Sequence, residues 1–268
     1  MTRTRNILAN RNLPVLSTFA SSNVLLAFDY DGTLAPIAAA PHLARMRART
    51  RQLLVRVTRV YPCVVISGRK LSDISRRVKR IPLCYVFGNH GLEPLADSAR
   101  AAAATAEWLR RLREQLPDHP GVVIEDKKHT VTIHYRAARD RGRAIAAIGD
   151  AVEKLPGARV VGGVEAVNLL PRDGPHKGEA LQRALRLFGC TTAIYVGDDA
   201  TDEDAFASAA SDRILGIRIG SAQASRARYH LLGQDDIDTL LKTLLTLRPV
   251  RRLDLKGGCA AIADRARP

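Results

Sequence analysis

The amino-acid sequence predicts an α/β protein in which a parallel sheet flanked by helices is interrupted by a smaller α+β domain. Three observations lead to this prediction. Short apolar segments alternate with helical patterns up to about residue 98, paired strand patterns follow until about residue 171, and the alternation then resumes. Alternating strands and helices are typical of a parallel sheet, whereas strands joined by short polar turns are typical of antiparallel hairpins. A chain of 268 residues is long enough for two such domains.

The first part of the parallel domain is expected to contain three strands. Each is a short apolar run, and leucine and valine residues at helical spacing separate the runs. Residues 1–22 are polar and contain Pro14, so we expect them to form a loose or docked N-terminal arm. In chain order, the predicted elements are strand 24–29, helix 43–60, strand 63–66, helix 71–80 and strand 83–87.

The inserted domain is expected to combine two helices with two strand pairs. Its first helical pattern contains Trp108 and ends before Pro117. Two alternating runs then flank a polar turn, which predicts an antiparallel hairpin. In chain order, the predicted elements are helix 101–116, strands 122–125 and 130–136, helix 139–155, and strands 158–161 and 165–170.

The alternating pattern of the parallel domain resumes after the inserted domain. The predicted elements are helix 175–187, strand 192–196, helix 205–210, strand 214–219 and helix 235–247, with a partly ordered basic tail over the last twenty residues. We therefore divide the chain into a first core part (1–98, with the arm 1–22), the inserted domain (99–171) and a second core part (172–268).

The strong positive charge is the unusual feature of the composition. The chain carries 42 basic and 27 acidic residues, which give a formal net charge of +15. Such a charge can attract nucleic acid, acidic lipid or anionic metabolites. The basic residues are scattered over the predicted helices and form no array with aromatic residues of the kind that binds single-stranded nucleic acid. We expect no nucleic-acid partner, and a phosphate substrate is compatible with the charge.

Features of membrane and zinc proteins are missing from the sequence. No apolar run reaches the roughly 18 to 20 residues that span a bilayer, and the first residues contain no signal-peptide core. The four cysteines show no paired metal spacing such as Cys-x-x-Cys, so a zinc site is not indicated. We expect a cytoplasmic protein without a membrane partner. The oligomeric state is unknown from the sequence.

Two carboxylates at the end of the first strand are the centre of the predicted site. Asp29 and Asp31 follow an apolar run and precede the flexible Gly32. Because strand side chains repeat with period two, the two acids are expected to share one side of the backbone. Two neighbouring acids repel each other, so they need a cation, a shared proton or water. The alternative is a turn without chemistry, since Asp and Gly often follow a strand for that reason alone.

Further polar residues follow the other core strands. Ser67 ends the second strand, Lys177 follows a proline-rich turn, and Asp198 and Asp202 end the fourth strand. In parallel sheets the ligand site lies beyond the carboxyl ends of the strands, so we expect these residues to meet Asp29 there. Magnesium prefers oxygen ligands and often sits beside a substrate phosphate, whose oxygens a lysine and a hydroxyl can hold. The set predicts phosphoryl transfer at a magnesium site.

Four segments of the chain resemble, in order and spacing, the motifs of the haloacid dehalogenase-like (HAD) phosphatases. Two longer strings look more specifically like the trehalose-phosphatase family, and the resemblance covers about residues 24–245. It implies a Rossmann-like core with a mobile inserted cap domain of the C2 type. It also implies magnesium-dependent hydrolysis of trehalose 6-phosphate to trehalose and phosphate, a step of trehalose biosynthesis. The four segments are DYDGTL (29–34), SGR (67–69), KG (177–178) and GDD (197–199), and the two strings are GNHGLE (88–93) and GDDATDEDAF (197–206).

The resemblance implies a role for each of the four acids. Asp29 would be the nucleophile that becomes phosphorylated. Asp31 would protonate the departing sugar oxygen and then deprotonate the water that cleaves the aspartyl phosphate. Magnesium would be held by Asp29, the main-chain oxygen of Asp31 and Asp198, with Asp202 in support, directly or through water.

The resemblance also implies which residues hold the phosphoryl group. These are Ser67, Gly68 and Lys177, which would bind its oxygens as charge redistributes in the transition state. Each residue has an alternative without catalysis. Ser67 and Asp202 could be helix caps, and Lys177 could be an exposed lysine in a first helical turn.

Contacts to the sugar are implied mainly for the inserted domain. Segment 125–127 and the alternating His134 and Arg136 match the part of the cap that contacts the sugar in the family. A solvated outer face of the hairpin is the alternative. At the expected hinge, His90 and Glu93 could bond to sugar hydroxyls or only hold the turn. The implied substrate-binding residues are Arg69, His90, Glu93, Glu125, Lys127, His134, Arg136 and Asn168.

One segment departs from the family pattern. Family members commonly show an acidic residue three positions before a proline, with a basic residue next to it, where this chain has Asn168-Leu169-Leu170-Pro171. Strand alternation puts Glu165 and Asn168 on opposite sides of the strand, so we do not assume that Glu165 replaces the acidic residue. The second hypothesis is therefore a phosphatase for another sugar phosphate, such as sucrose phosphate or a glycosyl phosphoglycerate. The third, from another class, is a non-catalytic sugar-phosphate sensor or a nucleic-acid binder.

Overall fold

The structure is a computed structural model of the whole chain. It describes residues 4–248, apart from residues 39, 95–97, 117–118, 211 and 221–223. The basic tail predicted for the last twenty residues lies outside the described residues.

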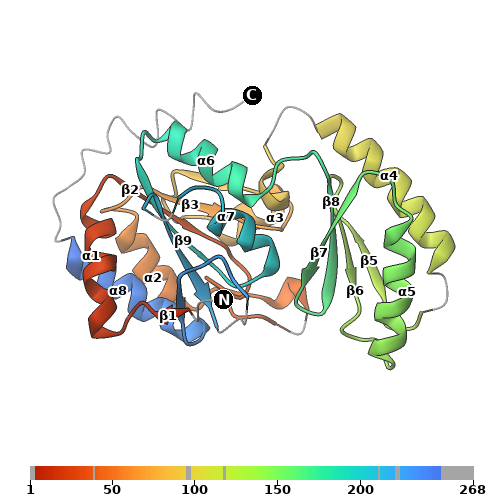
Figure 1. Cartoon of the computed structure of the whole chain (residues 1–268), viewed down its shortest axis with the longest axis horizontal. Helices are drawn as coiled ribbons and strands as arrows, with labels where there is room; N and C mark the ends of the chain where they lie inside the picture. The colour runs from red at the N-terminus through yellow and green to blue at the C-terminus, as the bar shows by residue number, and fades with distance from the viewer. Residues whose placement is uncertain are drawn as a thin grey trace.

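A seven-stranded sheet forms the larger domain (Figure 1). Its strand order is β1-β11-β10-β9-β2-β3-β4, and every neighbouring pair is parallel. The predicted parallel sheet is thus confirmed. The strands are β1 (Arg5–Asn6), β2 (Val24–Phe28), β3 (Cys63–Ile66), β4 (Tyr85–Phe87), β9 (Thr192–Gly197), β10 (Ile214–Ile219) and β11 (Tyr229–Leu231).

Helices cover both faces of this sheet because β2 is apolar on both sides. Leu26 and Phe28 belong to the apolar core under α1, α2, α3 and α8, whereas Leu25 and Ala27 belong to the core under α6 and α7. These helices are α1 (Leu13–Ser21), α2 (Ala48–Val57), α3 (Leu71–Arg77), α6 (Lys177–Leu187), α7 (Glu203–Phe206) and α8 (Ile237–Leu247). Short 3-10 helices are η1 (Asn10–Asn12), η2 (Pro41–Leu43), η3 (Asn89–Gly91), η4 (Ala200–Asp202) and η5 (Gln234–Asp236).

The smaller domain is an antiparallel sheet of order β5-β6-β8-β7 with two helices on the face away from the larger domain (Figure 1). Trp108 is 1% exposed in the apolar core between the helices and the sheet, and its indole nitrogen donates to the carbonyl of Pro156 at 2.9 Å. The division of the chain after residues 98 and 171 stays a prediction. The elements are α4 (Ser98–Gln115), β5 (Val123–Asp126), β6 (Val131–His134), α5 (Arg141–Glu153), β7 (Ala158–Gly163) and β8 (Ala166–Pro171).

The N-terminal arm is docked and more regular than the sequence indicates. Its strand β1 pairs with β11 at the edge of the sheet, with Arg5 opposite Tyr229. Helix α1 then follows, with Pro14 in its first turn, where the missing N–H of proline costs no hydrogen bond. Sequence analysis does not predict α1, β1 or β11, because β1 and β11 are short and partly polar and residues 1–22, which contain Pro14, show no sustained period.

Several hydrogen bonds join the two domains beside the hinge. The side-chain amide of Asn89 donates to the carbonyl of Lys127 at 3.0 Å and accepts from the hydroxyl of Thr130 at 3.1 Å. At the other side, Arg159 of β7 donates to Asp204 of α7 at 2.6 Å. Of the helices that the structure describes, none combines the length and the apolar composition needed to cross a membrane.

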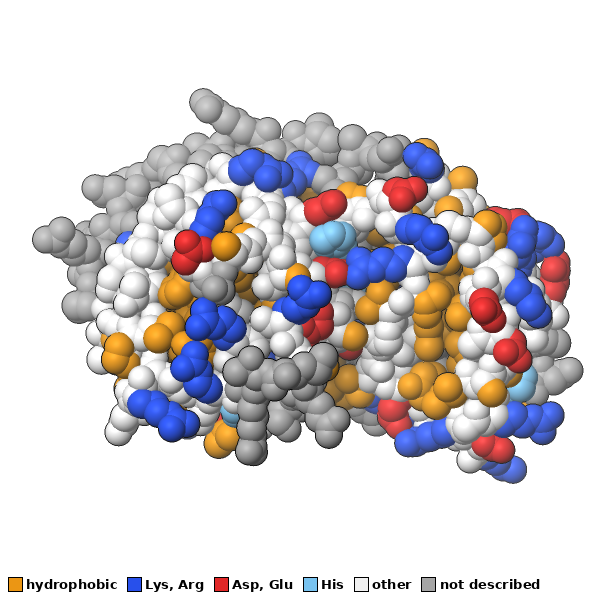
Figure 2. All heavy atoms as spheres, in the orientation of Figure 1, with side chains coloured by type: hydrophobic (Ala, Val, Ile, Leu, Met, Phe, Trp, Pro, Cys, Tyr) orange, Lys and Arg blue, Asp and Glu red, His pale blue; other side chains and the backbone are white. Residues whose placement is uncertain are grey.

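Basic side chains do not gather in a single tract on the face shown in Figure 2. Lys and Arg are spread there over both domains, among acidic and apolar side chains. On this face, the distribution agrees with the scattered basic residues that the sequence predicts.

Candidate active site

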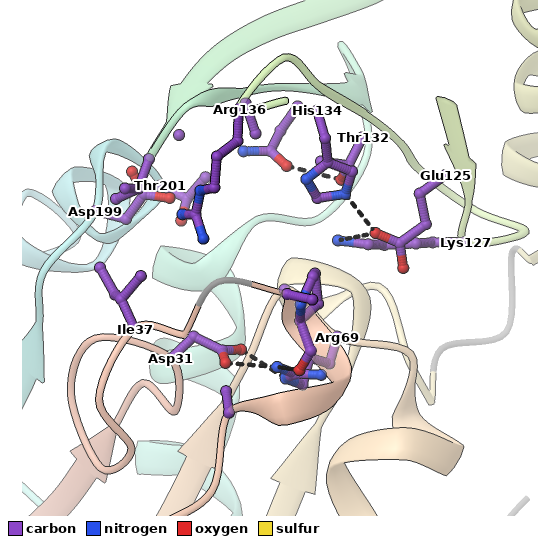
Figure 3. Close-up of a pocket in the computed structure, with 18 of the residues that line it drawn as sticks. Asp31, Ile37, Arg69, Glu125, Lys127, Thr132, His134, Arg136, Asp199 and Thr201 are labelled. Atoms are coloured by element: carbon purple, nitrogen blue, oxygen red, sulfur yellow. Dashed lines mark hydrogen bonds and ion pairs between the residues drawn. The ribbon is translucent and has the colours of Figure 1, made fainter. Parts of the chain in front are cut away.

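A cavity of about 700 Å³ lies between the carboxyl ends of the core strands and the sheet of the smaller domain (Figure 3). Both domains therefore contribute to its wall. Three of the predicted site residues do not line the cavity: Ser67 and Asp202, which are fully buried, and Glu93. The others line it: Asp29, Asp31, Gly68, Arg69, His90, Glu125, Lys127, His134, Arg136, Asn168, Lys177 and Asp198.

Asp29 stands at the floor of the cavity, directly after the fully buried strand β2. Its amide donates to the carbonyl of Val196 at 2.9 Å, which continues the pairing of β2 with β9. Only 5% of Asp29 is exposed. Burial, and secondarily the nearby carboxylates of Asp202 and Asp31, raise the pKa of Asp29 from 3.8 to about 8 although Lys177 lowers it. A carboxylate in this position is strongly attracted to any cation that enters.

Lys177 supplies a buried positive charge beside Asp29. Its Nζ lies 3.1 Å from Asp29 Oδ1 and 2.7 Å from Asp202 Oδ1, and the residue is 2% exposed. Lys177 is the first residue of α6, as expected. Its burial excludes the alternative of an exposed first-turn lysine, since a buried ammonium is retained only where it is paired.

Asp202 is a buried junction of four hydrogen bonds. Its Oδ1 accepts from Lys177 at 2.7 Å and from the hydroxyl of Tyr195 at 2.7 Å, and its Oδ2 accepts from the amides of Asp198 at 3.0 Å and Asp199 at 2.9 Å. Asp202 therefore fixes both the lysine and the backbone that presents Asp198. Sequence analysis missed Tyr195; the signal available was a phenol in an otherwise aliphatic buried strand, because a buried hydroxyl needs a partner.

Asp198 faces Asp29 across the turn after β2. Its Oδ1 accepts from the hydroxyl of Thr33 at 3.2 Å. Gly32 makes the approach feasible: its φ is +76°, and a Cβ there would lie 2.0 Å from Asp198 Oδ2. Burial, together with the charges of Asp29 and Asp202, raises the pKa of Asp198 well above its ordinary value.

The acids form a donor set that fits a hard divalent cation. One carboxylate oxygen from each of Asp29, Asp198 and Asp202 lies within 4.8 Å of the others. Two of these carboxylates, Asp29 and Asp202, lie beside the one ammonium of Lys177. Burial first, and then the neighbouring acids, raise the pKa of Asp29 and of Asp198. Oxygen-only donors favour Mg²⁺ over softer metals. The residues present therefore fit the magnesium site expected from the sequence.

Asp31 forms an ion pair with Arg69, whereas Asp29 and Asp202 pair with Lys177 (Figure 3). Arg69 Nε donates to Asp31 Oδ2 at 2.6 Å and Arg69 Nη2 to Asp31 Oδ1 at 2.6 Å. Arg69 is 8% exposed, so it also buries its guanidinium in this contact. The prediction had placed Arg69 among the sugar ligands.

Ser67 and Gly68 precede Arg69 at the end of β3. Ser67 is fully buried, and its hydroxyl accepts from the Arg69 amide at 3.2 Å, so it stabilises the turn and is not the N-cap of α3. Gly68 lies under the ring of His90, where a Cβ would be 2.5 Å from His90 Cε1.

His90 is buried at the cavity wall in a left-handed conformation, with φ of +59° and 4% exposure. Burial, and then the charges of Lys177 and Lys127, lower the pKa of His90 well below 6.5, so its ring is neutral. Neither ring nitrogen has a hydrogen-bond partner among the described residues. The hinge therefore places an uncharged imidazole between the floor and the roof of the cavity.

Glu93 holds the hinge and does not point into the cavity. Its Oε2 accepts from the amide of Leu71 at 2.5 Å, and its Oε1 lies 3.2 Å from His129 Nδ1. It thus joins the start of α3 to the β5–β6 turn. This geometry favours the turn-holding alternative for Glu93 over a sugar contact.

The predicted residues of segment 125–134 form the roof of the cavity (Figure 3). Glu125 Oε2 lies 2.9 Å from His134 Nε2 and 3.8 Å from Lys127 Nζ. Burial raises the pKa of Glu125, but the hydrogen bond from His134 and the charge of Lys127 outweigh it and the net shift is downward. Burial lowers the pKa of Lys127. The alternative of a solvated outer face is excluded, because the cap helices cover the other side of the sheet.

Asn168 and Thr132 complete the roof beside His134. They are opposite each other on β8 and β6, and the hydroxyl of Thr132 donates to Asn168 Oδ1 at 2.9 Å. Arg136 points toward the cavity from the end of β6, with Nε donating to Glu165 at 2.7 Å and Nη1 to the carbonyl of Ala38. Sequence analysis did not select Thr132, although its alternation with His134 puts both on one face.

Comparison with known proteins identifies the family. The family model described as trehalose-phosphatase matches residues 27–234. This chain belongs to the trehalose-phosphatase family. The family member described here is 37% identical over 207 residues to the trehalose-phosphate phosphatase of Mycolicibacterium paratuberculosis, covering 72% of this chain and 53% of that protein. The chain thus spans about half the length of this relative.

Solved structures of trehalose-phosphatase relatives confirm the fold. The C-terminal domain of Candida albicans trehalose-6-phosphate phosphatase superposes with a TM-score of 0.74 at 22% identity, covering 91% of this chain and 98% of that one. A sugar phosphatase of HAD subclass IIB superposes with a TM-score of 0.53 at 15% identity, covering 81% of this chain and 97% of that one. The HAD-type core with an added α+β cap, expected from the motifs, is therefore confirmed.

Proposed function

We propose that this chain is a magnesium-dependent phosphatase that hydrolyses trehalose 6-phosphate to trehalose and phosphate through an aspartyl phosphate. The observation that carries the proposal is the meeting of Asp29, Asp198 and Lys177 at the floor of a cavity whose roof is polar. Membership of the trehalose-phosphatase family supports the sugar.

The first half of the reaction uses Asp29 as nucleophile and Asp31 as acid. An oxygen of Asp29 attacks phosphorus while the bond from phosphorus to the sugar oxygen breaks. Asp31 gives its proton to that oxygen, so the sugar leaves as a neutral alcohol. Both carboxylates line the cavity at the end of β2, and the two roles separate naturally because Asp29 is buried at the floor and Asp31 is 38% exposed in its side chain.

The second half returns the enzyme to its starting state. Asp31, now a carboxylate, takes a proton from water, and the water oxygen attacks the phosphorus of the aspartyl phosphate. The bond from phosphorus to the Asp29 oxygen breaks, and inorganic phosphate leaves. Asp31 thus begins the next cycle protonated, and each half of the reaction balances.

Magnesium would be held by Asp29, the main-chain oxygen of Asp31 and Asp198. When bound, it neutralises charge on the phosphoryl oxygens and on Asp29. Asp202 supports this site through the backbone, because both of its oxygens already accept two hydrogen bonds each. Lys177 would bind a phosphoryl oxygen, and Gly68, with Ser67 fixing its turn, would present backbone to the same group.

The roof of the cavity would bind the sugar. Glu125, Lys127 and His134 form a connected polar group that offers both donors and acceptors to hydroxyls. Arg136 and Asn168 extend this surface, and the neutral ring of His90 stands between the roof and the floor.

A panel of phosphate esters tests the proposal. Purified chain is incubated with trehalose 6-phosphate, sucrose phosphate, glucosyl phosphoglycerate and glucose 6-phosphate, with magnesium and with chelator. We expect trehalose 6-phosphate to give the highest kcat/KM, and only with magnesium. Asp29→Asn should abolish turnover while its circular dichroism spectrum stays unchanged; phosphate release by this variant at the wild-type rate would contradict the mechanism.

A second candidate is the same chemistry on another sugar phosphate. Asn168 favours it, because an amide stands in the roof where family members commonly have an acidic residue that accepts from a hydroxyl. Sucrose phosphate or glucosyl phosphoglycerate turned over well above trehalose 6-phosphate would establish this candidate instead.

A further inference from the structure

Arg69 lines the cavity, yet its guanidinium donates four hydrogen bonds to acceptors within the protein. Besides its two bonds to Asp31, Arg69 Nη1 donates to Asp73 Oδ2 at 2.7 Å and Nη2 donates to the carbonyl of Pro41 at 2.6 Å. Its guanidinium carbon lies 5.7 Å from the centre of the Tyr30 ring. Tyr30 lies between Asp29 and Asp31 in the chain. Arg69 therefore joins the turn that contains the two reacting acids to the end of β3.

This environment leaves the guanidinium little to offer to a sugar. Nε, Nη1 and Nη2 all donate at 2.6 to 2.7 Å within the protein, and Arg69 is 8% exposed. A ligand that recruited Arg69 would have to replace short charge-assisted hydrogen bonds by bonds to neutral hydroxyls, which are weaker. The side chain that Arg69 does control is the carboxylate of Asp31, whose two oxygens both accept from it.

We propose that Arg69 is a positioning residue that sets the orientation of Asp31, and that it affects the reaction through this carboxylate rather than by binding the sugar. The inference rests on the proposed function, in which Asp31 moves the protons. Proton transfer requires Asp31 within hydrogen-bond reach of the leaving oxygen and of water, so its rotamer decides the rate. The planar fork of arginine fixes a carboxylate by two parallel bonds, which a lysine cannot do.

Asp73 and the carbonyl of Pro41 hold the guanidinium of Arg69 in place. Asp73 lies in the first turn of α3, four residues after Arg69, and also accepts from Arg77 Nε at 3.0 Å. Arg77 donates to the carbonyls of Ala44 at 2.5 Å and of Pro41 at 3.4 Å. Arg77 therefore shares the surroundings of Arg69 but, among the described residues, has no hydrogen bond or ion pair with Asp31, which makes it a matched control.

The test compares Arg69→Met and Arg69→Lys with Arg77→Met, using trehalose 6-phosphate or the best substrate of the panel. For Arg69→Met we expect kcat to fall by roughly 10- to 100-fold while KM changes less than about threefold, the size of effect that a misplaced catalytic group produces. Arg69→Lys should also lower kcat, because it keeps the charge but not the fork, and it preserves the test where Arg69→Met does not fold. Arg77→Met, which among the described residues loses contacts to Asp73 and Pro41 but none to Asp31, should lower kcat clearly less than Arg69→Met does.

A double variant shows whether Arg69 acts through Asp31. On an Asp31→Asn background, Arg69→Met should cause no further loss of kcat, since the group it orients can no longer transfer a proton. A rise in KM with unchanged kcat would make Arg69 a sugar ligand and overturn the inference. So would an additive loss in the double variant, or an equal loss in Arg77→Met. A wild-type chain that hydrolyses no phosphate monoester contradicts the proposed function, whereas an active wild type with an unaffected Arg69→Met contradicts only the role of Arg69.

Discussion

The ammonium of Lys177 lies 2.7 Å from the carboxylate of Asp202, and both side chains are shielded from solvent. The same ammonium lies 3.1 Å from Asp29, so a single buried cation balances two buried acids. Burial by itself lowers the pKa of Lys177, but the charges of Asp202 and Asp29 outweigh burial and raise this pKa above its ordinary value. We therefore expect both the stability of the fold and the proposed phosphoryl transfer to depend on the ammonium of Lys177.

Replacing Lys177 by Met should damage both properties. Removing one partner of a buried pair leaves the other charges uncompensated, so we expect the free energy of unfolding to fall by about 3 to 5 kcal/mol. Turnover should fall by roughly 100-fold or more, because a donor to the phosphoryl group is lost. Urea unfolding and phosphate release measure the two effects. Lys242→Met, an exposed lysine on α8, serves as control and should change neither.

The metal-free protein should lose stability as the pH rises. The pKa of Asp29 is about 8 in the folded chain and 3.8 ordinarily, so the folded state binds the proton more tightly. The resulting stabilisation is fully present below pH 3.8, decreases as pH rises, and is lost once pH passes about 8. With chelator present, the slope should approach about 1.4 kcal/mol per pH unit at most. Thermal unfolding from pH 5 to pH 9 should show a weaker dependence in Asp29→Asn; equal slopes in both proteins would contradict the assignment.

Magnesium should stabilise the folded chain, and Asp198 should be required for it. Binding to the native state alone adds about 2.7 kcal/mol at a hundred times Kd. Asp198→Ala should abolish the rise in Tm that magnesium produces in the wild type. Asp235→Ala, which removes an acid with an 88% exposed side chain, should keep it. A rise in Tm that survives in Asp198→Ala would place the cation elsewhere.

The topology could be predicted from the sequence where burial is complete on both faces. Val24–Phe28 is buried throughout, and an apolar run of this length followed by turn residues is typical of a central parallel strand. Arg5–Asn6 and Tyr229–Leu231 gave no comparable signal, because their pairing at the sheet edge depends on neighbours far away in the chain.

Some residues of the candidate site could likewise be predicted from the sequence, and others could not. Asp29, Lys177 and Asp198 could be predicted together, because strand ends of a parallel sheet converge. The contacts of Arg69 and Glu93 depend on side-chain directions at the hinge, which residue spacing does not encode. The resemblance implies both as substrate-binding residues, with holding the turn as the alternative for Glu93; in the structure Arg69 binds Asp31 and Glu93 binds the start of α3.

Trp108 offers a direct test of the predicted domain boundaries. It is the single tryptophan of the chain and is buried in the core of the smaller domain. If residues 99–171 form a separate domain, its fluorescence should change at a urea midpoint that differs from the far-ultraviolet circular dichroism midpoint of the whole chain. Leu240→Ala, in the core beneath α8, should shift the second midpoint and leave the first unchanged. Coincident transitions that move together would contradict independent domains.

Asn168 should decide which sugar phosphate is preferred. Its oxygen accepts from Thr132, so its amide nitrogen is the group that remains to donate to a ligand oxygen in the cavity. Asn168→Asp exchanges this donor for an acceptor with nearly the same shape. Because a site with a mismatched polar group discriminates strongly, the ratio of kcat/KM between trehalose 6-phosphate and the other sugar phosphates should change by roughly tenfold or more. Hydrolysis of p-nitrophenyl phosphate, which has no sugar to reach the roof, should change less than about threefold, since the floor of the cavity is untouched. An unchanged ratio would remove Asn168 from the sugar-binding surface, and an equal loss on all substrates would show that it supports the floor instead.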